Sequence, residues 1–493
     1  MPRGASGDEG ARAWAHRDDV LGHGACCGDR RIGDLCHGQG RDAGHDPRHR
    51  TGKRAFRHHL QRHRSGLDPH RILEPGRDRR RPPHPGGPPR PPRRDCQRRP
   101  VSGVGWLQLS DRADDRGRWR QHDTGIQGGA LSAPHVAIVG AGVIGAAVAF
   151  RLARAGARVT VVDAGLPAAQ ASGRSFGWIN ASFFLNAAHF ALRSEAMAAH
   201  HRLDADLPHG TTTWPGCLWW EETGEAFDRT EARLRGLGYP VAVLDRQALA
   251  ARLPHMAAIP DRALHFPTEG VTDTARLTRR LLAASGAEVW TGCPVTGVET
   301  ASGRACGLRL ASGRIGADHV VLAAGTGTPD LLAPLGIALA LPDRPGVLVA
   351  TRPLARVLDP VIVTPDQEIR QDAAGRLIAP AAASHQSDRA DRLAAPPGVL
   401  ADATIERLRA MFPGQAIALE SATVGWRPVP ADGLPVIGAA PLPGLWLAVM
   451  HSGATLCALA GEIMAAMILK GETHPLAAPF AATRPGLDRI TAG

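Results

Sequence analysis

Aromatic residues make up only 4% of this chain of 493 residues, and tyrosine occurs once, as Tyr239. Long uncharged segments are scarce as well. The longest stretch without Asp, Glu, Lys or Arg, residues 433–461, contains three prolines and several glycines, so it predicts buried strand, turn and helix. We therefore expect no membrane span.

The eight cysteines show no recognisable pairing pattern. Four of them lie beyond residue 130, and scattered cysteines of this kind are typical of reduced core thiols in a cytoplasmic protein. We therefore expect a cytoplasmic location. These four residues are Cys217, Cys293, Cys306 and Cys457.

Residues 1–130 differ in composition from the rest of the chain. They contain 27 Lys and Arg against 16 Asp and Glu, so the net charge of +11 resides there and residues 131–493 are neutral. Apolar periodicity is absent, which predicts a basic, disordered segment. Because GC-rich codons encode mostly Arg, Pro, Gly, His and Ala, we interpret it as out-of-frame translation, with the native protein beginning near Leu131.

Three functional interpretations of this segment are disfavoured. Clustered arginines neutralise phosphates, but aromatic residues that could stack on bases are few in this segment, so nucleic acid is not an expected partner. A targeting peptide would need an apolar core and few acids. The cysteines and histidine at 26, 27, 36 and 37 fit no standard zinc spacing, so we expect no metal.

A strand, a glycine-rich turn and a helix start follow one another at residues 135–145. Gly140 permits the tight turn, Gly142 lets backbone approach a pyrophosphate, and Gly145 lets the helix pack on the sheet. Asp163 ends the next strand, where a carboxylate accepts ribose hydroxyls. The pattern predicts a dinucleotide site, with Val143 and Ile144 at the helix N-terminus that faces the phosphates.

Only one such site is present. The segment 324–329, Ala-Gly-Thr-Gly-Thr-Pro, lacks the third glycine, and Pro329 is expected to interrupt the helix that a second site would need. An enzyme that reduces flavin with a nicotinamide usually carries two sites. A single site therefore favours FAD that is reduced directly by its substrate.

Caps and turns predict the remaining elements. Asp245 caps a helix to about Leu253, and Asp273 caps another to about Ser285, which Gly286 ends. Strands at 367–371 and 376–379 form a hairpin.

We predict an α/β fold: a Rossmann-type FAD-binding domain with an antiparallel β-sheet substrate domain, preceded by the disordered segment. We expect the FAD-dependent oxidoreductase to span 134–480. Its nucleotide-binding part is expected mainly at 134–215, 265–335 and 430–475, and its substrate-binding part mainly at 216–264 and 340–429.

The C-terminal segment contains Gly-Trp-Arg427-Pro, an Asp432-Gly-Leu-Pro turn, and Met-His451-Ser-Gly453. With residues 140–163, it resembles the FAD-dependent D-amino acid oxidase / glycine oxidase superfamily, over about 134–471. The resemblance implies that Arg427 binds a substrate carboxylate. It also implies that the turn before Ala454 opens a helix whose N-terminus faces the flavin, where reduced flavin carries negative charge.

The resemblance completes the candidate site. The loop at 171–180 resembles the family's loop along the cofactor, so Ser172 and Arg174 are expected to reach the pyrophosphate. D-amino acid oxidases commonly add tyrosine hydroxyls to the arginine, whereas this chain has Tyr239 alone, before a strand. Candidate catalytic residues are Arg427 and His451, and the other cofactor-binding candidates are Val295, Ala324, Gly325, Ser452, Gly453, Ala454 and Thr455.

The implied reaction is oxidation of a C–N bond in an amino acid or secondary amine of the D-amino acid, glycine or sarcosine kind. Hydride passes from the α-carbon to flavin N5, and the imine is hydrolysed. FAD is expected to be non-covalent, and oxygen or a quinone to be the acceptor. Two alternatives stay open: a tRNA-modifying enzyme with the same flavin module, and a non-catalytic flavoprotein.

Overall fold

The structure, a computed structural model, describes residues 97–98, 133–207, 211–382 and 389–487. Most of the predictions made for residues 1–130 therefore lie outside the described residues. Two residues of that segment are described: Gln97–Arg98 form the short strand β1, which pairs with Thr291 and Trp290.

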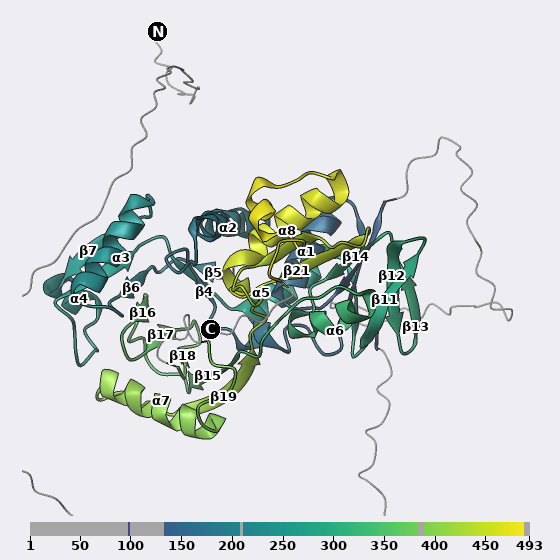
Figure 1. The fold of residues 1–493 in the computed structure, drawn as a ribbon. Helices are drawn as coiled ribbons and strands as arrows, with labels where there is room; N and C mark the ends of the chain where they lie inside the picture. Colours follow the sequence, from purple (N-terminus) through teal and green to yellow (C-terminus); the bar gives the residue numbers. More distant parts are fainter. Residues whose placement is uncertain (1–96, 99–132, 208–210, 383–388, 488–493) are drawn as a thin grey trace, which may run out of the picture. The chain divides into compact units, whose positions relative to one another are not determined.

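A seven-stranded sheet contains the predicted nucleotide strand (Figure 1). Its order is β1-β10-β3-β2-β14-β21-β20, and its strands run parallel except for the two outer ones. Parallel strands bring their carboxyl ends to one edge, where open α/β sheets bind ligands. The strands after β1 are β10 Glu288–Thr291, β3 Arg158–Val162, β2 His135–Val139, β14 His319–Leu322, β21 Leu445–Val449 and β20 Val436–Ala439.

Both faces of this sheet are covered. Successive side chains of β2 point to opposite faces, so Val136 and Ile138 pack in one core and Ala137 and Val139 in another. Helices cover the first face, and a three-stranded β-meander with the short α6 covers the second. The helices are α1 Val143–Arg154, α2 Ala187–Asp206, α5 Thr274–Ser285 and α8 Gly453–Lys470; the meander is β11 Val295–Ala301, β12 Arg304–Leu310 and β13 Gly313–Gly316; α6 is Thr328–Leu332.

A second sheet has eight strands in the order β19-β15-β18-β17-β16-β6-β8-β7. It is antiparallel except where β16 runs parallel to β6. Helix α7, Pro397–Met411, packs its buried side against it. The strands are β6 Cys217–Trp219, β7 Ala242–Asp245, β8 Arg262–Phe266, β15 Pro345–Thr351, β16 Val361–Val363, β17 Glu368–Gln371, β18 Leu377–Pro380 and β19 Leu419–Trp426.

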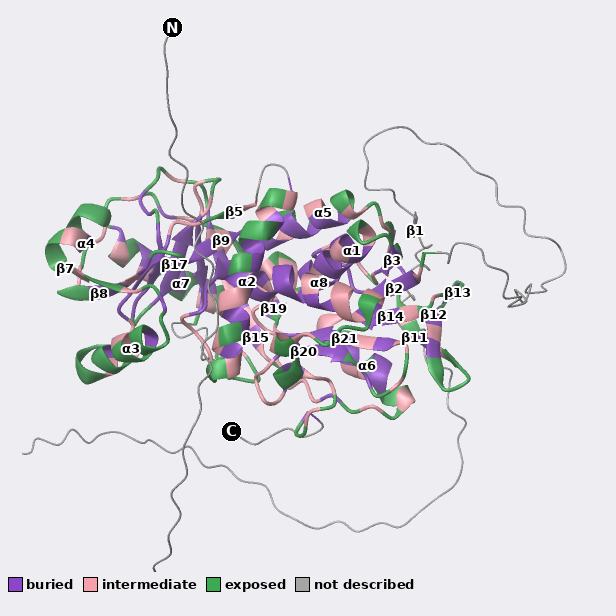
Figure 2. Cartoon of the chain, turned by 90° about the horizontal axis from the view of Figure 1, so that it is seen from above, coloured by how far each residue is buried: buried purple, intermediate pink, exposed green. Residues whose placement is uncertain are grey.

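The remaining elements are short or peripheral. Strands β4 Trp178–Ile179, β9 Gly270–Thr272 and β5 Thr212–Thr213 form a small sheet. Figure 2 shows that buried residues gather on the strands and on the helices packed against them, whereas α3, Gly224–Gly236, is mostly exposed.

The predicted helix ends are confirmed. Asp245 accepts a hydrogen bond from Ala248 N (2.8 Å) at the start of α4, Arg246–Arg252. Asp273 does the same for Arg276 N (2.9 Å) at the start of α5, which ends at Gly286 in the left-handed region, φ 62°. The hairpin of β17 and β18 is also confirmed. These elements follow from local capping and turn chemistry.

The uncharged stretch 433–461 forms β20, β21 and the start of α8, as predicted. Helix α8 is long and apolar enough to cross a membrane by length and composition, but 67% of it is buried inside the protein. It packs between α1 and α2, which explains its apolar character without a membrane.

Two predictions need correction. Pro329 does not interrupt a helix: it lies in the first turn of α6, where its missing N–H is not needed. Cys293 is disulfide-bonded rather than reduced, whereas Cys217, Cys306 and Cys457 are free. Sequence spacing alone does not reveal which cysteines are bonded, which is why this bond was not predicted.

Candidate cofactor and substrate site

A cavity of about 600 Å³ lies at the carboxyl ends of the parallel strands. Its wall includes residues at the ends of β2, β3, β14 and β21, and residues of β15, β18 and β19 from the eight-stranded sheet. This is the edge at which open α/β sheets bind ligands, and the volume is typical of a small-molecule site.

The glycine-rich turn leaves no room for side chains. Gly140 has φ +109°, and a Cβ there would lie 2.3 Å from Ala323 O, directly after the neighbouring strand β14. A Cβ on Gly145 would lie 2.0 Å from Gly140 O. The turn can therefore press against β14, and α1 can start directly behind it, as the motif predicts.

Asp163 follows β3 and organises the same turn. Its carboxylate accepts hydrogen bonds from Ala141 N and Gly165 N, both at 2.7 Å. One oxygen thus holds the glycine-rich turn and the other holds the loop after Asp163. Each oxygen keeps a second lone pair, so the carboxylate can still accept from a ribose hydroxyl.

Two helix N-termini meet at this cavity. Gly142 caps α1 and Ser452 caps α8, and a Cβ on Gly453 would lie 3.4 Å from Val143 Cγ1. Ser452 has a left-handed backbone, φ 58°, a conformation that is uncommon for non-glycine residues and enriched at functional sites. Because each N-terminus carries partial positive charge, the cavity suits a ligand with two separate regions of negative charge.

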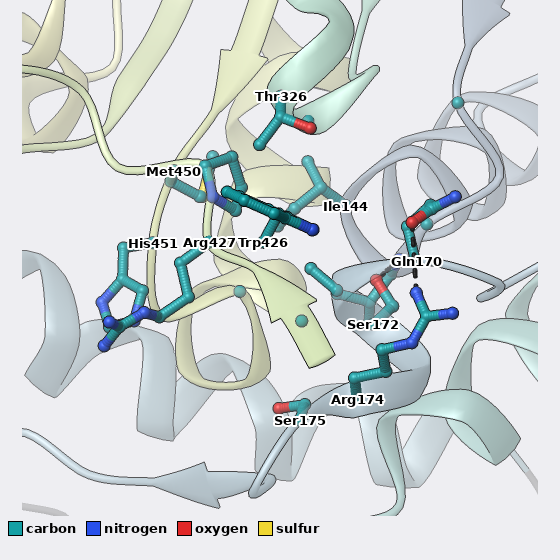
Figure 3. Close-up of a pocket in the computed structure, with 18 of the residues that line it drawn as sticks. Ile144, Gln170, Ser172, Arg174, Ser175, Thr326, Trp426, Arg427, Met450 and His451 are labelled. Carbon is teal, nitrogen blue, oxygen red and sulfur yellow. Dashed lines mark hydrogen bonds between the residues drawn. The ribbon is translucent and has the colours of Figure 1, made fainter. Parts of the chain in front are cut away.

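The loop after β3 supplies further polar groups. Ser172 Oγ accepts from Val143 N (2.9 Å) in the first turn of α1, so its own hydrogen is available to a ligand. Arg174 donates from Nη1 to Gln170 Oε1 (3.1 Å), and both side chains lie at the same side of the cavity (Figure 3).

Arg427 lies where β19 ends, and part of its guanidinium is held by backbone carbonyls. Nε donates to Arg344 O and Nη2 to Pro345 O, both at 3.2 Å. His451 also lines the cavity, with Nδ1 3.2 Å from Ser452 Oγ. Figure 3 shows Arg427 and His451 on the side of the view away from Ser172 and Arg174.

The structure brings nearly all the predicted site residues together. Gly145 and Thr455 do not line the cavity: Gly145 packs behind the turn, and Thr455 is buried in α8. The lining residues that were predicted are Gly140, Gly142, Val143, Ile144, Asp163, Ser172, Arg174, Val295, Ala324, Gly325, Arg427, His451, Ser452, Gly453 and Ala454.

Most of the lining residues were not predicted as part of the site. Thr326, Trp426 and Met450 adjoin predicted positions, so extending the motifs by one residue finds them. Arg193 and Asn180 also line the cavity. Arg193 lies within the long helix α2, and no sequence signal marks it.

Behind Arg193 lies a buried acid, Glu269. Its carboxylate accepts from Trp178 Nε1 (2.8 Å), Ser182 Oγ (2.6 Å) and Tyr239 Oη (2.8 Å). Burial raises the pKa of Glu269 to about 7, while those donors and the charge of Arg193 oppose the rise. Tyr239 does not line the cavity, as its sequence position suggested.

The residues present fit FAD. The turn at 140–145 and the start of α1 match a pyrophosphate, Asp163 can bind a ribose, and the start of α8 supplies positive charge for a second, ring-bearing region. Among the described residues, no group of three or more His, Cys, Asp and Glu side chains could hold a metal ion.

Known proteins resemble this chain along most of its length. D-amino acid dehydrogenase from Paramagnetospirillum magneticum is 26% identical over 68% of this chain and 94% of its own. Glycine oxidase from Geobacillus kaustophilus is 28% identical over 71% of this chain and 96% of its own. A crystal structure of glycine oxidase from Geobacillus kaustophilus superposes with a TM-score of 0.63 at 26% identity, covering 71% of this chain and 99% of that one.

A family of flavin enzymes matches the same region. The family described as FAD dependent oxidoreductase, DAO, covers residues 135–467, which include both large sheets apart from β1 and the whole cavity wall. The chain therefore belongs to the DAO family of FAD-dependent oxidoreductases.

Proposed function

We propose that this enzyme oxidises the C–N bond of an amino acid or secondary amine that carries a carboxylate, of the D-amino acid, glycine or sarcosine kind. One observation supports this most strongly: Arg427 lines the same cavity as the N-termini of α1 and α8. A guanidinium, which binds carboxylates in pairs of hydrogen bonds, thus lies in the wall of the dinucleotide site.

The backbone around Arg427 prepares it for this role. Two of its donors are occupied by Arg344 O and Pro345 O, which restrict the side chain before substrate arrives. The conformational entropy of this long side chain is then lost when the protein folds rather than when the substrate binds. Holding the carboxylate fixes the α-carbon, and positioning supplies most of the rate enhancement in such a reaction.

FAD, when bound, supplies N5 as the acceptor for hydride from the α-carbon, and water hydrolyses the imine to an oxo acid. We propose non-covalent FAD, because none of the described lining residues is cysteine and Cys457 is buried within α8. Oxygen or a quinone is the proposed acceptor. A cytoplasmic location stays a prediction.

Substitution of Arg427 tests the proposal. A charge-assisted pair contributes about 1.5–3 kcal/mol, so Arg427→Met should raise KM for a carboxylated amine by about 10- to 100-fold. Arg427→Lys should also be impaired, since lysine keeps the positive charge but lacks the planar pair of N–H donors that binds both carboxylate oxygens. The same amine without its carboxylate should be affected much less. Steady-state kinetics on the matched pair of amines measures this.

Arg314→Met provides the control, because Arg314 is an exposed arginine of the meander that does not line the cavity. It should leave both substrates unaffected. Equal losses for both amines in Arg427→Met, or loss of FAD absorbance, would assign Arg427 a structural role and overturn the proposal.

A further inference from the structure

Arg193 is an arginine buried in the wall of the cavity, with only 2% of its surface exposed. Nε donates to Asn180 O (3.0 Å) and Nη2 donates to Asn180 Oδ1 (2.6 Å). Within the described residues, Nη1 makes no hydrogen bond. It is nevertheless not a fully buried atom that lacks a partner, so it is not sealed inside the protein. Because Arg193 lines the cavity, this nitrogen is available to a ligand there.

The surroundings place Arg193 beside the first turn of α8. Asn180 N donates to Thr455 Oγ1 (3.3 Å), and Thr455 Oγ1 donates to Trp178 O (3.3 Å). Farther along α2, His200 Nε2 lies 2.8 Å from Ala454 O. The cationic side chain and the positive end of the α8 dipole therefore act on the same part of the cavity.

The negative charge of Glu269 offsets the positive charge of Arg193, but Glu269 makes no hydrogen bond to Nη1 of Arg193. It is fully buried, does not line the cavity, and has its three donors in Trp178, Ser182 and Tyr239. Its attraction opposes the effect of burial, which lowers the pKa of Arg193 to about 10. Arg193 thus stays protonated at neutral pH.

We propose that Arg193 acts with the N-terminus of α8 to stabilise negative charge on the reduced flavin, and so raises its reduction potential. Two electrons and one proton arrive together from the substrate, which leaves one negative charge on the ring around N1 and C2=O. A buried guanidinium in a site of low dielectric stabilises such a charge strongly. This inference rests on FAD binding in the cavity, and it can fail separately from the substrate proposed above.

Sulfite reports this charge without any substrate. Its sulfur lone pair forms a bond to flavin N5, nothing leaves, and the added electron pair places negative charge around N1 and C2=O. In the FAD-loaded protein, Arg193→Met should weaken sulfite binding at least tenfold. The reduction potential, measured by equilibration with a redox dye, should fall by about 30 mV for each tenfold change in a two-electron equilibrium.

Three further variants separate charge from structure. Arg193→Lys keeps the charge and should retain most of the sulfite affinity. Arg193→Met with Glu269→Gln removes both buried charges, which keeps the test valid if the single variant fails to fold. Arg370→Met removes another buried arginine, 9% exposed, whose Nε donates to Phe176 O and which does not line the cavity. It should change neither readout.

Unchanged sulfite affinity and potential in the folded double variant would overturn the proposal. A rise in KM for carboxylated amines with both flavin readouts unchanged would assign Arg193 to substrate binding and would also overturn it. Loss of FAD from the folded double variant would assign Arg193 to cofactor retention, with the same consequence.

Discussion

Gly145 lies in the first turn of α1, where the helix comes closest to the glycine-rich turn that precedes it. A Cβ at this position would meet Gly140 O at 2.0 Å and the Ala323 side chain at 3.5 Å. Both neighbours belong to rigid, buried elements, so neither can move without disturbing the cavity wall. Gly145 thus permits close contact between α1 and the glycine-rich turn, and it does not itself contact the ligand cavity.

Gly145→Ala should lower the melting temperature and the FAD content of the purified protein. Overpacking of this kind costs about 1–3 kcal/mol. Gly236→Ala is a matched control in α3, because nothing lies within 4 Å of the added methyl group and alanine favours a helix. Thermal melts and quantification of bound FAD measure both effects. A melting temperature and an FAD content in Gly145→Ala equal to those of the unsubstituted protein would contradict the close packing.

Helices α2 and α8 are joined by a histidine that has no contact with solvent. His200 Nε2 lies 2.8 Å from Ala454 O and 3.1 Å from Thr455 O, so it holds the first turn of α8 from the side. Burial lowers the pKa of His200 to about 4, although those carbonyls favour the charged form. The native protein therefore keeps this histidine neutral.

This lowered pKa predicts a pH dependence of stability. The pKa of a histidine in the unfolded chain is near 6.5, so the unfolded state binds a proton below that pH. Native His200 does not bind this proton until the pH falls to about 4. The free energy of unfolding should therefore fall as the pH drops from 6.5 to 4, by up to about 1.4 kcal/mol per pH unit.

His200→Gln should reduce this slope by the contribution of one proton, as measured by denaturant unfolding at several pH values. His189, whose pKa burial lowers to about 3, continues to contribute in the same direction. The control is Val399→Ala, at an exposed position of α7 that carries no titratable group, and it should leave the slope unchanged. An unchanged slope in His200→Gln would show that this histidine is not held neutral in the native state.

Elements with local signals were predictable from the sequence, and the others were not. The strand, turn and helix at β2 and α1, the Asp-capped α4 and α5, and the β17–β18 hairpin depend on residues that are close along the chain. Helix α2 is different, because it buries Arg193 and His200 among partners 13 to 255 residues away. A buried charge with distant partners has no local pattern.

At the scale of the whole molecule, function depends on the meeting of two sheets. The seven-stranded sheet supplies the turn and both helix N-termini, while the eight-stranded sheet supplies Arg427. All the predicted site residues except Gly145 and Thr455 lie in the cavity wall, although much of that wall carries no motif. The strand order, and the parallel join of β16 to β6 across more than 140 residues, follow from long-range packing that the sequence pattern does not express.

The central claim is that one cavity holds FAD and a carboxylated amine that reduces it directly. Anaerobic addition of candidate amines to the FAD-loaded protein, followed by flavin absorbance, tests this claim in one measurement. We predict that at least one carboxylated amine bleaches the flavin and that NADH or NADPH alone does not. Rapid bleaching by a nicotinamide without any amine, or no bleaching by any carboxylated amine across a broad panel, would contradict it.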